Sequence, residues 1–552
     1  MLSGVSLALT PAPLIVAVIV VYALPRGAAA VARLAGLGAM LATIALLGID
    51  STAITGGGRV QASFGSPLPG VDYLLRADSV GMAIAFTAAV AALLVLLQRD
   101  ISRRGIAGVL LCAIGGVGAS LAGNAVILFG ALEVANLGAF ALLTARRRRP
   151  GRGAMTLLFI EHLAALGLLA AAADLQASTG TSDFSALPGG ALTVAVATPW
   201  ALAGTLRLVS PALGPVRAAR GLMAAWAATA AVPTGAAVLL RLREVAGGGV
   251  PTPDALLLAG LGAAIALGGA AMAARWRRVP VLGGRGLCAA AAGPPIALAG
   301  FQGGSAATAV AVGLCALELA VAASSAWERA GLQGPSRAAR ALAALAAGGL
   351  PIGFGATAFV VELTAVVLLG RQATALLVAL IFAAVLAAAA SVSMAASVLV
   401  ASAAHREAQA VAPLALVAVV AGLVAAVVPG AAAGGAARLL AGGGSLASAG
   451  AGAVVGPAGG WAGGYFVVAA LLLGAATLGA MAVGGVRLPR LRADPRQDGQ
   501  RSLPLRIGLF RAIRRPARFA LTAAPMVDAW LVVQPQLPLI AAGAILAVLL
   551  IH

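Results

Sequence analysis

The run ATALLVALIFAAVLAAAASVSMAASVLVASAA, residues 373–404, decides the fold class of this chain because it contains no charged side chain. A helix needs about 20 consecutive apolar residues to cross roughly 30 Å of hydrocarbon, and this run exceeds that length. Runs at residues 11–25, 82–97 and 250–274 reach or approach it. Because such runs follow one another with short gaps, the pattern indicates an all-α membrane protein rather than a barrel.

The composition of the whole chain agrees with this interpretation. Of its 552 residues, 61% are hydrophobic and only 10% are charged. A soluble core cannot absorb so much apolar surface. The 72 glycines suit close helix packing in lipid. The first apolar run follows no basic segment and precedes no small-residue cleavage site, so we expect it to be retained as a helix.

The formal net charge of +20 comes from arginine alone, because the sequence contains no lysine. Most arginines lie at the ends of predicted helices and in short loops, which is typical of topology signals and not of a nucleic-acid-binding face. Hydropathy predicts about 16 spans. Placing the N-terminus outside gathers the arginine clusters on the cytoplasmic side, which supports both this count and the orientation. Residues 50–73 and 176–190 are then exterior loops. An arginine keeps its proton in proteins, whereas a buried lysine can lose it.

Two predicted spans are interrupted in a comparable way. The seventh, residues 191–213, contains Pro211 and is followed by Pro215, and the twelfth, residues 341–370, contains Pro351 after two glycines. Proline inside a helix frees a carbonyl and bends the helix. Comparable breaks in two halves indicate an inverted-repeat transporter, and chance breaks in a Gly- and Pro-rich chain are the alternative.

The C-terminal region has a different pattern. Residues 486–518 are strongly basic and place arginines on one helical face and apolar residues on the other. This pattern predicts an amphipathic helix on the membrane surface, followed by a last span at residues 537–551.

Ionisable residues inside the predicted spans are candidates for function, because they are rare at bilayer depth. They are Glu133, Glu161, His162, Arg207, Arg285, Glu318 and Glu362. We expect Glu133 and Arg207 to form a buried ion pair, either as part of a proton relay in a hydrated cleft or as a permanent bridge between helices. Glu161 and His162 are neighbours in sequence and point to different parts of their helix, and a solvated position at the helix end is the alternative for them.

Signals for chemistry in solution are absent from the sequence. A Walker-type phosphate loop needs a lysine, and the three histidines lack metal-ligand spacing. Cys112, Cys288 and Cys315 lie in apolar stretches at unrelated spacings. The sequence therefore predicts no cofactor, no metal and no enzymatic chemistry in this chain.

Several local motifs point to one family. The helix GNAVILFGALE, residues 123–133, is apolar and ends in a glutamate; residues 178–184 read STGTSDF, and residues 349–354 read GLPIGF. With LLRADS at residues 74–79 and AGTLR at residues 203–207, they resemble the antiporter-like proton-channel subunits. That family is shared by respiratory complex I, related membrane-bound hydrogenases and Mrp-type cation/proton antiporters.

The resemblance implies two inverted five-helix repeats with broken seventh and twelfth helices. It makes Glu133 the family carboxylate and places Arg207 where the family has the lysine that pairs with it. Two further family lysines fall near Pro233 and Thr357. The resemblance therefore implies either a reduced relay, in which Glu133, Glu318 and Glu362 act with water, or a scaffold that does not pump.

The expected organisation has five parts. They are N-terminal helices (1–105), a first repeat (106–245), a second repeat (250–404), additional helices (405–485), and the lateral segment with a terminal helix (486–552). The expected function is that of a membrane-arm subunit of a complex-I-like or hydrogenase-like respiratory assembly. It would contribute to proton or cation/proton translocation across the plasma membrane of a bacterium, bound to other membrane subunits and not to nucleic acid. The alternatives are a non-pumping structural subunit and a stand-alone secondary transporter.

Overall fold

The computed structural model describes residues 2–25, 27–54, 59–65, 72–97, 101–145, 152–187, 192–213, 222–246, 250–277, 279–301 and 373–400, with shorter pieces between 306 and 369 and at 447–448 and 454–455. In chain order, its helices are α1 (Leu2–Leu9), α2 (Ala12–Ala23), α3 (Ala29–Ile54), α4 (Ser79–Leu96), α5 (Arg103–Ser120), α6 (Ala125–Thr144), α7 (Arg152–Thr179), α8 (Val194–Leu213), α9 (Leu222–Trp226), α10 (Val232–Val245), α11 (Thr252–Arg275), α12 (Pro280–Ala299) and α16 (Thr374–Val400). A π-helical turn, Ala227–Ala231, joins α9 to α10.

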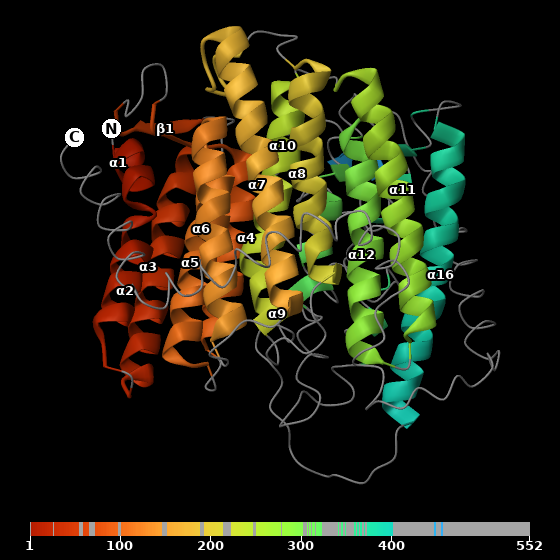
Figure 1. Cartoon of the computed structure of the whole chain (residues 1–552), viewed down its shortest axis with the longest axis horizontal. Coiled ribbons are helices and arrows are strands. Elements are labelled where there is room, and N and C mark those ends of the chain that lie inside the picture. Colours follow the sequence, from red (N-terminus) through yellow and green to blue (C-terminus); the bar gives the residue numbers. More distant parts are fainter. Residues whose placement is uncertain are drawn as a thin grey trace. The chain divides into compact units, whose positions relative to one another are not determined.

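The described helices confirm a multi-pass membrane protein. Eight helical segments in the described part of the chain are long and apolar enough to span a bilayer. They are Gly4–Ala23, Ala29–Thr52, Ala125–Thr144, Ala154–Thr179, Met223–Val245, Thr252–Arg275, Val281–Ala299 and Thr374–Ala395. These helices run side by side (Figure 1). The total of about 16 spans stays a prediction for the whole chain.

Glycines let neighbouring helices approach backbone to backbone. Each of Gly262 and Gly269 on α11, and Gly286 and Gly293 on α12, lies so close to the facing helix that an added Cβ would overlap backbone atoms there. The spacing of seven residues on both helices places these glycines on one seam. Such small-residue seams are how helices associate in lipid, where no hydrophobic force drives them together.

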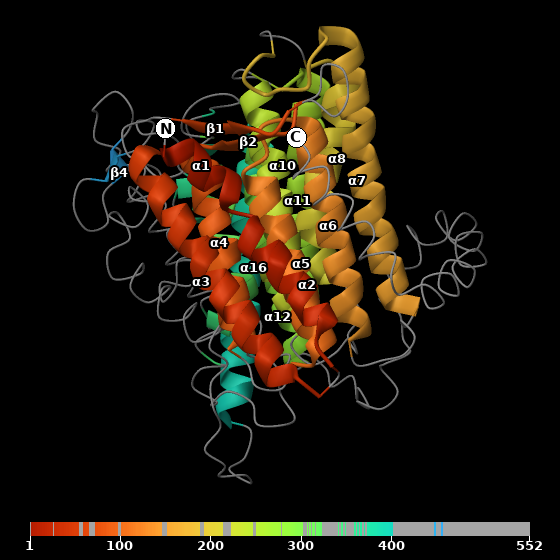
Figure 2. The same ribbon diagram turned by 90° about the vertical axis from the view of Figure 1, so that its left-hand side faces the viewer.

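A β-hairpin lies across one end of the helices (Figure 2). Strand β1 (Val60–Ser63) pairs antiparallel with β2 (Leu74–Ala77), with Val60 opposite Ala77. The expected exterior loop at residues 50–73 is therefore partly wrong, because α3 continues to Ile54 and Asp50 is buried within it. Exposed apolar residues continue along α3 to Ile49, so hydropathy alone does not mark where the helix ends.

Four charged residues fasten this hairpin to the helices, and we call them the ion-pair cluster. Arg76 on β2 lies 2.5 Å from Glu244 on α10, and Arg241 of the same helix lies 2.5 Å from Asp78. Arg241 also lies 2.6 Å from Glu244, and Arg76 lies 3.1 Å from Asp78. Because each cation contacts both carboxylates, the cluster ties β2, the start of α4 and the end of α10 together.

Asp78 also caps α4, since its carboxylate accepts the Gly81 N–H at 2.7 Å. Burial alone would raise the pKa of this carboxyl. The positive charge of Arg241, the Gly81 N–H and the charge of Arg76 outweigh burial, so the pKa of Asp78 lies below its ordinary value of 3.8.

Several predicted features lie outside the described residues. Of the expected additional helices (405–485), only β3 (Ala447–Ser448) and β4 (Val454–Val455) are described, and these two short strands pair with each other. The expected lateral amphipathic segment and terminal helix at residues 486–552 lie wholly outside the described part. They remain predictions.

Two adjacent glycines of α11 offer a matched test of the packing. Gly269→Leu should lower the free energy of unfolding by about 1–3 kcal/mol through overpacking against α12. Gly268→Leu makes the same chemical change where no atom lies within 4 Å of the added Cβ, and it should leave stability within about 0.5 kcal/mol. Thermal unfolding of the purified chain in detergent measures both variants, and equal loss in both would contradict the α11–α12 seam.

The ion-pair cluster predicts a pH dependence of stability. Because the pKa of Asp78 is lower in the folded state, this carboxylate stabilises the fold above its ordinary value of 3.8, and that stabilisation is lost as pH falls through the folded-state value. Asp78→Asn should lose roughly 1–3 kcal/mol at neutral pH, with the difference from wild type shrinking below about pH 4. Melting curves across pH, with the exposed Asp174→Asn as control, test this; a pH-independent difference would be evidence against it.

Candidate functional site

Arg207 on α8 is completely buried, and groups from several helices surround its guanidinium. The Nη2 atom of Arg207 donates to the carbonyl of Leu132 at 3.1 Å and to the side-chain oxygen of Asn136 at 2.7 Å, both on α6. Nη1 contacts the hydroxyl of Thr234 on α10 at 3.3 Å. A cation at this depth needs such partners, because lipid and apolar side chains offer none.

The charge of Arg207 is neutralised by Glu161 on α7. Nη1 of Arg207 lies 3.0 Å from Oε2 of Glu161, and neither side chain is exposed. The expectation of a solvated helix-end position for Glu161 is therefore wrong. Glu161 lies within the candidate span Ala154–Thr179, and its carboxylate faces α8.

A second pair joins α6 and α7 on their partly exposed side. The imidazole Nδ1 of His162 on α7 lies 3.0 Å from Oε1 of Glu133 on α6. These side chains are partly exposed, His162 by 53% and Glu133 by 30%. Consecutive residues on a helix are rotated by about 100°, so Glu161 and His162 face different neighbours as expected.

Asn136 connects the two pairs. Its amide nitrogen donates to Oε1 of Glu133 at 3.3 Å, while its oxygen accepts from Arg207. The result is a continuous row of polar side chains, His162–Glu133–Asn136–Arg207–Glu161, running from the partly exposed face of α6 and α7 into the protein. We call this row the polar row.

The structure corrects the expected ion pair between Glu133 and Arg207. On α6, Leu132 and Asn136 are four residues apart and share the face toward α8, whereas Glu133 is rotated away from it toward α7. Asn136 therefore occupies the place beside Arg207 that we expected Glu133 to occupy. An expectation based on ionisable residues misses Asn136 because its side chain is uncharged, although the sequence contains only one other asparagine, Asn124.

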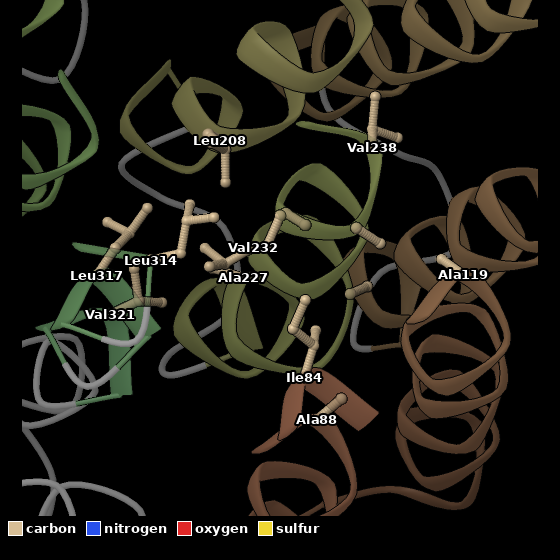
Figure 3. Close-up of a cluster of buried hydrophobic side chains, with 14 of the residues drawn as sticks. Ile84, Ala88, Ala119, Leu208, Ala227, Val232, Val238, Leu314, Leu317 and Val321 are labelled. Atoms are coloured by element: carbon tan, nitrogen blue, oxygen red, sulfur yellow. The ribbon is translucent and has the colours of Figure 1, made fainter. Parts of the chain in front are cut away.

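A π-helical turn just before Pro233 positions the last partner of Arg207. Proline has no N–H, so the carbonyl of Thr229 four residues earlier lacks its helical hydrogen bond, and the π-helical turn Ala227–Ala231 precedes this point. Figure 3 shows Ala227 and Val232 of this region among apolar side chains of α4, α8 and the helix Val312–Ala322. The turn is fully buried and directs Thr234 toward Arg207.

The expected break at Pro211 is wrong, because Pro211 lies inside the continuous helix α8. α8 passes through Pro199 and Pro211 and ends at Leu213. Pro215 and Pro351 lie outside the described residues. Their roles as helix breaks therefore remain predictions.

The remaining candidates of the second half are buried but separate from the polar row. Glu318 and Glu362 are almost completely buried, and within the described part Oε1 of Glu318 accepts no hydrogen bond. An added Cβ at Gly313 would overlap the Glu362 carboxylate, so Glu362 packs against the helix that carries Glu318. Arg285 is buried on α12.

The described residues contain no group of three or more His, Cys, Asp or Glu side chains placed to hold a metal ion. The polar row offers exchangeable protons on the imidazole of His162 and the carboxyl of Glu133, beside the ion pair that Glu161 forms with the permanently charged guanidinium. Such a set suits the holding and transfer of protons.

Comparison with known sequences gives no assignment, because no family model and no curated protein matches the chain. Solved structures do match. A chain of the Mrp complex from Dietzia sp. DQ12-45-1b has 21% identity and a TM-score of 0.68, covering 98% of this chain. The match spans only 63% of that Mrp chain, so this chain is similar to part of it.

Two further assemblies contain similar chains. The membrane-bound sulfane sulfur reductase, an archaeal respiratory membrane complex, matches with 15% identity and a TM-score of 0.67 over 99% of this chain and 98% of that one. Respiratory complex I from Thermus thermophilus with bound NADH matches with 18% identity and a TM-score of 0.59, over 79% of this chain and 98% of that one. The chain therefore has the fold shared by membrane chains of these complexes, which confirms the resemblance to antiporter-like subunits at the level of the fold.

Proposed function

We propose that this chain is a membrane subunit of a multi-subunit complex of the Mrp or respiratory type, and that it translocates protons across a bacterial plasma membrane. The observation that carries this proposal is the polar row. It places five polar side chains in contact at bilayer depth, where isolated ionisable groups are strongly destabilising. The fold shared with chains of the Mrp, sulfane sulfur reductase and complex I assemblies supports the subunit role.

Within this proposal, the two pairs have different tasks. Arg207 cannot release its proton, so Arg207 and Glu161 act as a fixed, mutually neutralised pair. Glu133 and His162 both exchange protons, and their 3.0 Å contact allows a proton to pass directly between them. Asn136 holds Glu133 at a constant distance from the fixed charge of Arg207.

The proposal extends to the second half of the chain. Glu318 and Glu362 are buried acids that lie in or against one helix, Val312–Ala322. We assign them to a continuation of the relay beyond the first repeat, in which water molecules bridge the acids that do not contact one another. This keeps the reduced, lysine-free relay expected from the sequence.

The exposure of Glu133 and His162 supports a partner subunit. Charged groups in membrane spans face a protein interior or a water-filled cavity rather than lipid. The same face carries exposed apolar side chains, Leu137 on α6 and Leu163 and Leu166 on α7. We infer that another membrane subunit covers this face in the assembled complex.

Proton flux tests the division of tasks. Glu133→Gln should reduce proton uptake into vesicles containing the complex by at least about tenfold, because the glutamine cannot exchange a proton. His162→Gln should also slow uptake, because glutamine cannot accept and release a proton as the imidazole does. The control is Asp174→Asn, an exposed carboxylate of α7 outside the polar row, which should leave uptake unchanged.

Variants of the fixed pair test stability, not proton flux. Glu161→Gln leaves Arg207 as an unpaired buried charge, so it should destabilise the chain by about 3–5 kcal/mol. The double variant Glu161→Gln/Arg207→Gln removes both charges and should recover most of that stability.

If wild type and Glu133→Gln give equal proton traces while both assemble normally, the chain is a non-pumping scaffold. The permanent Arg207–Glu161 bridge is the observation that favours this second candidate.

Cross-linking tests the partner. A photo-reactive amino acid in place of Leu137 should form an adduct with another membrane protein in native membranes, because this side chain is 52% exposed four residues from Glu133. The same variant purified alone in lipid discs should form lipid adducts. Lipid adducts alone in both preparations would rule out a partner on this face.

A further inference from the structure

A second buried polar group lies far from the polar row, between α1 and α3. The hydroxyl of Ser6 on α1 hydrogen-bonds to Oδ1 of Asp50 on α3. The hydroxyl of Thr10 donates to the carbonyl of Ser6 at 3.0 Å, and the hydroxyl of Thr43 reaches the carbonyl of Thr10 at 3.5 Å. Asp50, Thr10 and Thr43 are all fully buried. These residues precede both predicted repeats, and the proposed relay does not use them.

Asp50 has no cationic partner in the described part of the chain. Its Oδ2 is buried without a hydrogen bond, so the Ser6 hydroxyl is the one hydrogen-bond partner that the described residues give this carboxyl group. The helices α1, α2 and α4 and the strand β1, which pack on or near α3 in this region, contain no charged residue. Arg59, directly before β1, is exposed to solvent. The arginines of α5, Arg103 and Arg104, lie at its first turn, where Arg103 bonds the carbonyl of Leu24 near the opposite end of α3. Arg76 on the paired strand β2 is already bound to Asp78 and Glu244, and Arg33 lies 17 positions away on α3, about 25 Å along its axis.

The position of Asp50 in its helix also opposes a negative charge. Asp50 lies four residues before the end of α3 at Ile54, where the helix dipole presents its negative end. Asp254 provides the contrast. It is also buried and accepts a hydrogen bond from one hydroxyl, that of Thr198, but it lies in the first turn of α11, where the dipole is positive.

Burial, the lack of a cation and the helix dipole all favour the neutral form of Asp50. We propose that Asp50 is a proton-binding carboxyl that stays protonated at neutral pH, forming with Ser6 a site separate from the polar row. A neutral carboxyl in an apolar setting is the group that hydrophobic carbodiimides modify. The acid proton moves to one carbodiimide nitrogen, the carboxyl oxygen bonds to the central carbon to give an O-acylisourea, and rearrangement to an N-acylurea keeps every atom of both reactants.

Dicyclohexylcarbodiimide labelling of the full chain in native membranes tests the proposal, with peptide mass spectrometry to locate the adduct. At neutral pH the peptide containing Asp50 should gain one carbodiimide severalfold more often than the peptide containing Asp254. The Asp50 adduct should decline as pH is raised, because only the protonated acid reacts. Asp50→Asn should remove the adduct from that peptide, and because asparagine has the shape of the neutral acid, the variant should assemble as wild type does.

Two results would overturn the proposal. One is an unlabelled Asp50 in a preparation where another buried carboxyl of the chain is labelled, which shows that the reagent reached the protein interior. The other is equal labelling of Asp50 and Asp254 with no dependence on pH. Because the measurement follows one peptide in the unmodified sequence, it is independent of proton flux through Glu133.

Discussion

The buried guanidinium of Arg207 keeps its proton and therefore needs hydrogen-bond acceptors and a counter-charge. The arrangement of the surrounding helices supplies them. α6 supplies Asn136 and a carbonyl, α7 supplies Glu161, and α10 supplies Thr234. A buried charge without partners destabilises a protein by several kcal/mol, so a rotation of any one of these helices is strongly disfavoured. One side chain of α8 therefore sets the rotation of its neighbours.

Such contacts are possible only because the backbones are close. Gly138 lies against Cys112 where α5 and α6 meet, and Gly116 lies against the carbonyl of Thr229. An added Cβ at either position would overlap these backbone atoms. An Ala- and Gly-rich composition thus has a structural role beyond making the chain apolar. It brings the few polar side chains within hydrogen-bonding distance of one another.

The sequence predicted where the chain is helical better than which way each helix faces. The run at residues 373–404 corresponds to α16, Thr374–Val400, and the resemblance placed Glu133 and Arg207 in membrane helices. It failed on their pairing, because lipid is as apolar as the protein interior and these helices have no amphipathic stripe that shows their buried side. The burial of Asp50 within α3 was missed for a similar reason, since hydropathy treats a single acid near a helix end as the start of a loop.

The partly exposed pair of Glu133 and His162 has a consequence for the life of the protein in the cell. If another subunit covers this face, as proposed, a newly made copy without it presents an acid and an imidazole to hydrocarbon within two candidate spans. Such an orphan is less stable than the assembled form, because binding that covers the pair adds directly to stability. Under the proposed assembly, the copies that lack a partner are thus the ones most exposed to unfolding and removal.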